Sequence, residues 1–528
     1  MKDQRENFQE NSMHNQPPSE TTFAVATLGC KVNQADSEAI GEQMSDAGFV
    51  QRDFNEIADV YIVNTCTVTH LGDRSSRQLI SQARRRHPEA LLVVTGCYAE
   101  LSPKSVAALP GVDLVIGNSG KDSLADTIKE QWKTKEPGEP EQPKPDPAQA
   151  PMVGGSLATN PSPTPRPSLP MLPLDTRYTQ YMQHIGSDSS LAIDPTEEEP
   201  QPDNPSRPFT LQEAILPASV SARLVSRTRV QMKVQDGCDN RCTYCIVPYV
   251  RGGSRSRSIA SVVEHVQRKV RAGFQEIVLT GIHLGDYHPD KDQKQDLGDL
   301  IAALLRETGI PRIRVSSLEP EDFRLEWLEL WKNPRMCRHF HLPMQSGSDS
   351  ILRRMARRYN SARYRTIVTT ARQLIPGVAI STDIITGFPG ESDSDFEQTY
   401  QLAKELQFAK THVFRFSPRQ GTPAARMKGQ IKDEVKKARS ERLLALNEDH
   451  SRLFRQQFLG ETAEVLIESY KHGRWEGLTD NYLRVELENL PGAETHNWQN
   501  TLVKAGLSHL VDDGICGIVV EGASCFQL

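Results

Sequence analysis

The chain is 528 residues long and carries 62 Lys and Arg against 68 Asp and Glu, which gives a formal net charge of −6. This length allows about three domains, and the slight acidic excess argues against nucleic-acid binding through overall charge. Six of the nine cysteines stand in motifs suited to free thiolates, which favours a reducing compartment over a disulfide framework. Because no apolar run could cross a bilayer and the polar N-terminus lacks the apolar segment of a signal peptide, we expect a soluble, cytoplasmic, monomeric protein with no membrane partner.

An α/β domain is predicted over residues 21–132, after a disordered tail at residues 1–20. Its expected strands and helices alternate, with strands at residues 23–28, 60–63, 91–95 and 112–116 and helices at residues 37–47 and 73–86. One cysteine follows each of the first three strands, and we call Cys30, Cys66 and Cys97 the N-terminal trio. Parallel strands end at one edge of a sheet, where ligands bind, so we expect the trio to converge on one site. Taken singly, each could be an ordinary buried cysteine.

A Pro-rich acidic segment comes next. Residues 133–208 hold 17 of the 34 prolines and 11 acidic against 6 basic residues. Such a composition cannot bury enough apolar surface to offset the entropy lost on ordering, so residues 133–224 are predicted to be a disordered insertion. The rest of the chain is then close to neutral and can carry local basic surfaces.

A second α/β domain is predicted over residues 225–457. Its strands are expected at residues 229–234, 276–280, 312–315, 337–342, 378–385 and 411–416. Its helices are expected at residues 258–272, 297–308, 325–332, 348–358, 361–374 and 392–406. Six alternating units predict a partial (β/α)6 barrel with parallel strands and an active site at the C-terminal strand ends.

The first of these strands leads into a loop with three closely spaced cysteines. Cys238, Cys242 and Cys245, which we call the loop trio, follow the pattern C-x3-C-x2-C. Three thiolates can hold an iron–sulfur cluster and leave one iron open for a small chelating ligand. The alternative is a structural zinc site, which needs a fourth ligand, and the next candidate, His265, lies well beyond on a predicted helix. The spacing therefore favours a cluster.

Residues 458–528 form the last predicted domain. Short strand-like runs separated by turn residues predict a five-stranded β-barrel, with strands at residues 463–468, 473–476, 482–485, 501–505 and 517–521. Small barrels of this kind often bind oligonucleotides. The alternative is a stabilising cap without a ligand.

Four stretches together resemble the methylthiotransferase family of radical S-adenosylmethionine (SAM) enzymes. They read TLGCKVNQ at residues 27–34, NTCTVT at residues 64–69, GCY at residues 96–98 and DGCDNRCTYCI at residues 236–246. The first two are most similar to the branch that acts on N6-threonylcarbamoyladenosine beside the anticodon of tRNA. The resemblance covers nearly all of the chain outside the acidic insertion, where the family has a much shorter connection.

The resemblance implies two 4Fe–4S clusters and SAM as cofactors. The loop trio would hold the catalytic cluster that cleaves SAM, and the N-terminal trio would hold an auxiliary cluster to which sulfur attaches. A radical is needed because the C2–H of adenine is neither acidic nor electrophilic enough for displacement. In the family, one SAM methylates the sulfur and a second generates the radical.

SAM contacts are expected at strand ends by analogy with the family. Tyr244, inside the cysteine loop, could pack beside the adenine of SAM, and Gln345 is expected to line the pocket. Glu319 and Asp383 could accept hydrogen bonds from its ribose or ammonium group. Each has a structural alternative, namely loop packing for the tyrosine and a helix cap or loop ion pair for the two acids.

The resemblance also implies a nucleic-acid partner. The last domain is similar to the TRAM module, so the tRNA anticodon stem-loop is the expected partner, together with unidentified sulfur and electron donors. Basic runs at residues 84–86, 251–257 and 353–358 are candidates for RNA contact, and the second is best placed because it follows the cysteine loop. A charge run can also be no more than a solvated face.

The sequence therefore predicts an enzyme that adds a methylthio group to C2 of N6-threonylcarbamoyladenosine in tRNA. Three alternatives stay open. The same chemistry could act on isopentenyladenosine in tRNA or on an aspartate of a ribosomal protein. A non-catalytic RNA-binding protein, whose cysteines hold structural metal, is the third.

Overall fold

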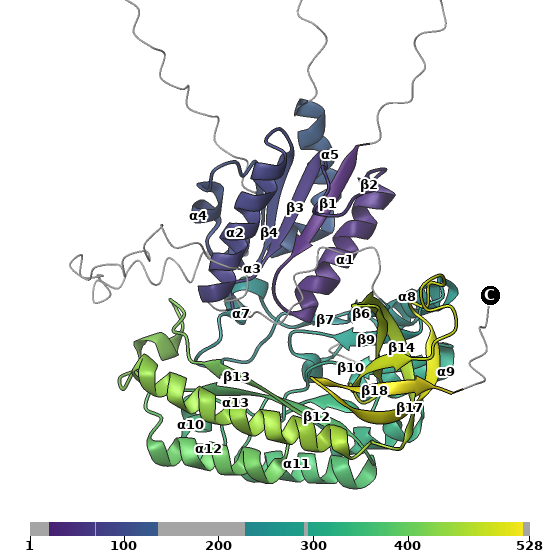
Figure 1. Cartoon of the computed structure of the whole chain (residues 1–528). Helices are drawn as coiled ribbons and strands as arrows, with labels where there is room; N and C mark the ends of the chain where they lie inside the picture. Colours follow the sequence, from purple (N-terminus) through teal and green to yellow (C-terminus); the bar gives the residue numbers. More distant parts are fainter. Residues whose placement is uncertain (1–20, 69, 136–227, 290–293, 521–528) are drawn as a thin grey trace, which may run out of the picture.

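The computed structural model describes residues 21–68, 70–135, 228–289 and 294–520. It consists of an N-terminal α/β domain, a central partial barrel and a small C-terminal β-barrel beside the central domain (Figure 1). The predicted tail at residues 1–20 and nearly all of the predicted insertion at residues 133–224 lie outside the described residues. Within these ranges, none of the helices combines the length and the apolar character that crossing a bilayer requires.

The N-terminal domain is built on a parallel sheet with the strand order β2-β1-β3-β4-β5. Its strands are β1 (Thr22–Thr27), β2 (Val50–Gln51), β3 (Val60–Thr65), β4 (Leu91–Gly96) and β5 (Leu114–Ile116). The flanking helices are α1 (Lys31–Asp46), α2 (His70–Arg86), α3 (Cys97–Leu101), α4 (Pro103–Ala107), the 3-10 helix η1 (Asn118–Ser123) and α5 (Leu124–Lys135). Successive strand residues enter two apolar clusters on opposite faces of the sheet, which gives the predicted layered α/β fold.

Helix α1 begins at Lys31, well before the start at residue 37 that the sequence predicted. Its first turn is held by a buried side chain rather than by a local cap. The amide of Asn33 donates to the backbone oxygens of Leu28 at 2.7 Å and Thr65 at 3.0 Å. Because these contacts are tertiary, the local sequence gave no signal for the earlier start.

The central domain contains two three-stranded parallel sheets, ordered β10-β9-β6 and β11-β12-β13. The strands are β6 (Arg229–Lys233), β9 (Glu276–Thr280), β10 (Arg312–Val315), β11 (His339–His341), β12 (Ala379–Thr386) and β13 (Lys410–Arg415). Isolated bridges between Ile313 and Met336 and between Ser317 and His341 join the two sheets. The predicted partial barrel of six parallel strands is therefore confirmed.

The helices of the central domain alternate with these strands as predicted. They are α8 (Ile259–Arg271), α9 (Leu297–Glu307), the 3-10 helix η5 (Leu325–Lys332), α10 (Asp349–Arg354), α11 (Ser361–Leu374) and α12 (Asp393–Leu406). The sequence analysis missed the long helix α13 (Asp433–Gln456), which contacts β13. It also missed the short elements beside the cysteine loop, β7 (Gln235–Asp236), α7 (Val247–Arg251) and β8 (Arg255–Ser256).

The C-terminal domain is a closed five-stranded barrel with the order β14-β15-β16-β18-β17, as predicted. Its strands are β14 (Thr462–Lys471), β15 (Arg474–Thr479), β16 (Arg484–Glu488), β17 (Leu502–Val511) and β18 (Gly514–Val519). A buried arginine of the central domain anchors it. Arg314 pairs with Glu276 at 2.6 Å and donates to the backbone oxygen of Asp480 at 2.7 Å, so one side chain joins the two domains.

Candidate active site

The structure brings the N-terminal trio to one edge of the sheet. Cys30 caps α1 after β1, Cys66 follows β3, and Cys97 is the first residue of α3 after β4. These three strands are neighbours in the sheet. Gly29 holds the preceding turn at φ +102°, and a Cβ there would lie only 2.9 Å from the Cys66 sulfur. The close approach of the two loops therefore requires glycine.

The other two thiols of this trio affect the ionisation of Cys66. Burial, with the nearby Cys97 and Cys30, raises the pKa of Cys66 to about 12. Neighbouring thiolates repel one another, so they ionise together only beside a compensating positive charge. The iron ions of a cluster supply such a charge, and the donor set therefore fits an iron–sulfur cluster.

The loop trio lies between β7 and α7, past the C-terminal end of β6. The Arg357 guanidinium donates to the Cys242 sulfur at 3.2 Å. Burial raises the pKa of the Cys242 thiol, and Arg357 acts against that shift. Tyr244, in the same loop, packs edge-on against Phe388 with ring centroids 6.4 Å apart. Its contact with the adenine of SAM stays a prediction.

Zinc and a 4Fe–4S cluster differ in the spacing they require of three thiolates. Tetrahedral zinc bonds of about 2.3 Å would bring thiolate sulfurs within about 4 Å of one another. A 4Fe–4S cluster binds each thiolate through a different iron and accepts wider spacing. Within the described ranges, the group of three His, Cys, Asp or Glu ligand atoms that all lie within 4.8 Å of one another is His341, Asp383 and His412.

The two trios lie near each other across the joint between the first two domains. Cys97 packs against Ile246 and Val250, which follow the loop trio directly. Asn118 spans the same joint, because its amide donates to the Val250 backbone oxygen at 2.7 Å and lies 3.9 Å from the Cys97 sulfur. The edge of the N-terminal sheet thus faces the catalytic end of the barrel (Figure 1).

A cavity of about 900 Å³, which we call the central cavity, opens between the three domains. Cys30 lines it from one side and Val247, just after the loop trio, from another. Three of the residues predicted to contact SAM also line it, namely Glu319, Gln345 and Asp383. The cavity therefore gives a molecule access to the region of both trios.

Partners hold these three polar side chains in place. Glu319 forms an ion pair with Arg357, and Asp383 pairs with Nε2 of His341 at 3.2 Å. Gln345 adopts φ +59°, and its backbone amide donates to the backbone oxygen of Asp383 at 2.8 Å. The unusual backbone of Gln345 thus ties it to the neighbouring strand inside the site.

Several side chains of the site were not singled out from the sequence. His283 places Nδ1 3.7 Å from the Cys238 sulfur and Nε2 2.6 Å from Asp322. His341 and His412 line the central cavity with Asp383. The available signal was positional, since His283 closely follows a predicted strand end and the other two lie inside predicted strands.

Comparison with known proteins then decides the family. Family models match the radical SAM superfamily at residues 232–403 and an uncharacterized protein family, UPF0004, at residues 22–117. The chain is 36% identical to the threonylcarbamoyladenosine tRNA methylthiotransferase MtaB of Bacillus subtilis, over 88% of this chain and 90% of the relative. The enzyme of the same name from Thermotoga maritima is 34% identical, over 90% of this chain and 93% of the relative. The chain belongs to the MtaB-like family of radical SAM methylthiotransferases.

Other relatives are more distant. A tRNA-2-methylthio-N(6)-dimethylallyladenosine synthase from Pelotomaculum thermopropionicum is 30% identical, over 85% of this chain and 87% of the relative. Among solved structures, the radical SAM methyltransferase TsrM from Kitasatospora setae has a TM-score of 0.48 and 16% identity, over 77% of this chain and 74% of that chain. Membership of the MtaB-like family makes SAM and 4Fe–4S clusters the cofactors of the chain, and the two thiol trios fit them.

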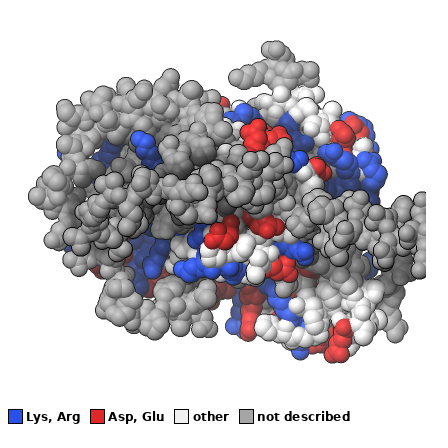
Figure 2. All heavy atoms as spheres, turned by 90° about the horizontal axis from the view of Figure 1, so that it is seen from above, with Lys and Arg blue, Asp and Glu red and all other residues white. Residues whose placement is uncertain are grey.

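Two arginines of the basic runs predicted to contact RNA are buried, and the contact of the run at residues 251–257 with RNA stays a prediction. Arg251 is buried and pairs with Asp36 and Asp236, each at 3.0 Å. Arg357, in another of the basic runs, is also buried and faces the cysteine loop. From above (Figure 2), basic and acidic side chains of the visible described residues are interspersed. RNA contact therefore has to come from residues other than these two.

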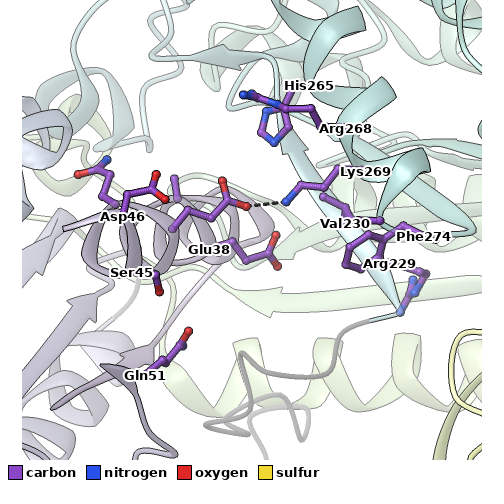
Figure 3. A pocket seen from close by; sticks show the side chains of 15 residues that line it. Glu38, Ser45, Asp46, Gln51, Arg229, Val230, His265, Arg268, Lys269 and Phe274 are labelled. Carbon is purple, nitrogen blue, oxygen red and sulfur yellow. Dashed lines mark hydrogen bonds and ion pairs between the residues drawn. The ribbon is translucent and has the colours of Figure 1, made fainter. Parts of the chain in front are cut away.

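A second cavity, of about 750 Å³, lies between α1 and α8 (Figure 3). Lys269 of α8 points toward α1 and pairs there with Glu42 at 2.5 Å. His265 and Arg268 line it from the same helix. No cysteine is among its lining residues, so this cavity belongs to the joint between the domains rather than to the thiol trios.

Proposed function

We propose that the chain transfers a methylthio group to C2 of N6-threonylcarbamoyladenosine in the anticodon stem-loop of tRNA. The observation that carries this proposal is the placement of two cysteine trios beside one cavity in a chain that is similar to MtaB enzymes along most of its length. The lower identity to the dimethylallyladenosine enzyme favours the threonylcarbamoyl substrate.

Each trio would hold one 4Fe–4S cluster, and Glu319, Gln345 and Asp383 would contact SAM. When bound, these cofactors supply a carbon radical and the sulfur that C2 receives. The protein's own part is placement. The Arg357 guanidinium orients Glu319 and donates to the Cys242 sulfur. The joint between the first two domains keeps the N-terminal trio beside the central cavity.

The C-terminal barrel would hold the RNA. Several of its residues line the central cavity together with Cys30, among them Lys471, Tyr482 and Arg484. An anticodon loop bound by this barrel could therefore extend one nucleoside into the cavity. Base recognition in single-stranded loops uses such extruded nucleosides.

Nucleoside analysis of tRNA from a deletion strain tests the proposal. We expect the deletion to remove the 2-methylthio form of threonylcarbamoyladenosine and to leave 2-methylthio-isopentenyladenosine intact. Plasmid-borne wild type should restore the 2-methylthio form of threonylcarbamoyladenosine, and Cys66→Ala should not. Cys516→Ala is the control and should also restore this form, because Cys516 is buried in the C-terminal barrel. Normal methylthiolation of threonylcarbamoyladenosine in the deletion strain would refute the proposal.

A further inference from the structure

Two lysines in the central cavity have no acidic partner. Lys31 and Lys410 both line it, and no ion pair joins either to a carboxylate within the described part of the chain. Four carboxylates that line the cavity are paired with arginines: Glu319 with Arg357, Glu468 with Arg229, and both Glu476 and Asp513 with Arg484. The fifth, Asp383, contacts Nε2 of His341 at 3.2 Å. Within the described lining, Lys31 and Lys410 are therefore cations without an ion-pair partner.

Lys31 and Lys410 affect the pKa values of neighbouring side chains. Burial lowers the pKa of His412, Asp383 opposes that shift, and His341, Lys410 and Lys31 add to it. The Lys31 ammonium lies 5.9 Å from the centre of the Tyr482 ring. Burial would raise the pKa of Tyr482, but nearby cations, Lys31 among them, bring it down to about 8. Lys31 and Lys410 thus place positive charge on the lining of the cavity, where an anion can bind.

The proposed substrate carries such a group. A threonylcarbamoyl substituent retains the carboxylate of threonine, whereas a dimethylallyl substituent is a hydrocarbon. A carboxylate that leaves water for a partly buried cavity is stable only if cations bind it there. Lys31 directly follows Cys30, so a carboxylate bound by it would be near the N-terminal trio.

We propose that Lys31 and Lys410 bind the threonyl carboxylate of the substrate and thereby select N6-threonylcarbamoyladenosine over adenosines with an uncharged N6 group. This inference rests on the proposed function. It assigns substrate selection to the first residue of α1 in the N-terminal domain and the first residue of β13 in the central domain. The site is complete only when the two domains are docked.

Equilibrium binding of two RNAs tests the inference. Labelled anticodon stem-loops that carry either threonylcarbamoyladenosine or plain adenosine at the same position are titrated with full-length, cluster-reconstituted protein, anaerobically and without SAM. Wild type should bind the modified RNA about tenfold more tightly, as a charge-assisted contact worth about 1.4 kcal/mol predicts. The double variant Lys31→Met, Lys410→Met should lose this preference and keep its affinity for the plain RNA within about twofold.

Two further variants test whether the positive charge at these positions causes the preference. Lys31→Arg should retain most of the preference because it keeps the positive charge. Lys404→Met, an exposed lysine of α12, is the matched control and should bind both RNAs like wild type. If Lys31→Met lowers the iron content, Lys410→Met alone must still reduce the preference by about threefold, or the proposal fails.

The outcomes separate this inference from the proposed function. A preference that survives in the double variant, or a wild type that binds both RNAs equally, would overturn the inference. Equal weakening on both RNAs would overturn it too, since it would assign the lysines to backbone phosphates. Single-turnover assays with SAM are run on the same two RNAs. A wild type that does not methylthiolate the modified RNA would instead refute the proposed function, whatever the lysines bind.

Discussion

Arg251 and Asp36 form a buried ion pair, at 3.0 Å, between the segment after the loop trio and the helix that begins just after Cys30. Lys121 adds a second contact to the same carboxylate at 2.7 Å. Arg251 ends α7 and Asp36 lies early in α1, so the pair sets how far apart the two trios are held. This buried ion network therefore joins the two domains beside the cysteine trios.

Asp36→Asn is expected to lower the free energy of unfolding by about 3 kcal/mol, because it removes the carboxylate that pairs with Lys121 in a buried joint and leaves Lys233 and Arg251 to share Asp236. Burial alone would raise the pKa of Asp36, but these cations hold it far below its usual range, so the carboxylate is ionised at neutral pH. Denaturant titration of the purified protein measures the loss. Asp46→Asn, exposed at the end of the same helix, should change stability by less than about 0.5 kcal/mol. Equal stability of both variants would show that the network is dispensable.

Arg314→Met should loosen the attachment of the C-terminal barrel. Arg314 is fully buried, and its removal leaves Glu276 buried without its closest partner, at an expected cost of about 3 kcal/mol. The Arg314 guanidinium also lies 4.2 Å from the centre of the Tyr482 ring, so a cation–π contact to the barrel is lost as well. Limited proteolysis, followed by mass spectrometry, should show faster release of a C-terminal fragment. Arg306→Met, an exposed arginine of α9, should be cleaved like wild type.

The fold and the cysteine trios could be predicted because their signals are local. Cys30, Cys66 and Cys97 each follow an apolar run long enough for a strand, and parallel strands must end at one edge. The loop trio is contiguous, so its spacing alone indicated one compact site. The strands of the C-terminal barrel were likewise marked by turn residues between short runs.

The buried polar contacts could not be predicted because they join distant segments. Arg251 and Arg357 belong to basic runs of the kind that is usually exposed, yet each forms an ion pair with an acid from another part of the chain. Asn33 looks like a loop residue and instead holds the first turn of α1. His412 has no neighbour in sequence that marks it as part of the cavity. Such roles become visible only when the domains are docked.

Arg357→Met is expected to lower the reduction potential of the cluster proposed for the loop trio by on the order of tens of millivolts. The substitution removes the N–H donor to the Cys242 sulfur and leaves Glu319 and Glu321 without a positive partner, and both effects stabilise the oxidised cluster. Potentiometric titration followed by electron paramagnetic resonance measures the shift. Arg353→Met, exposed on α10, is the control and should keep the wild-type potential. An unchanged or raised potential in the Arg357 variant would contradict this role.

His265 should make stability fall as the pH drops below neutral. Burial lowers the pKa of His265 to about 4, helped by Arg257, Lys269 and Arg268 and opposed by Glu42. Between its unfolded pKa of about 6.5 and this value, the unfolded chain takes up a proton that the folded protein does not, so stability present above pH 6.5 is lost as the pH falls.

Because the His265 ring is half-buried, solvent screening limits the effect to about 1 kcal/mol. Denaturant titrations at pH 7.5 and pH 5 should show wild type losing about that much more stability than His265→Gln. His472→Gln, in an exposed turn, should follow wild type at both values. Equal losses of stability in wild type and His265→Gln would mean that the His265 ring takes up a proton equally in the folded and the unfolded protein. The joint in Figure 3 would then not keep His265 neutral.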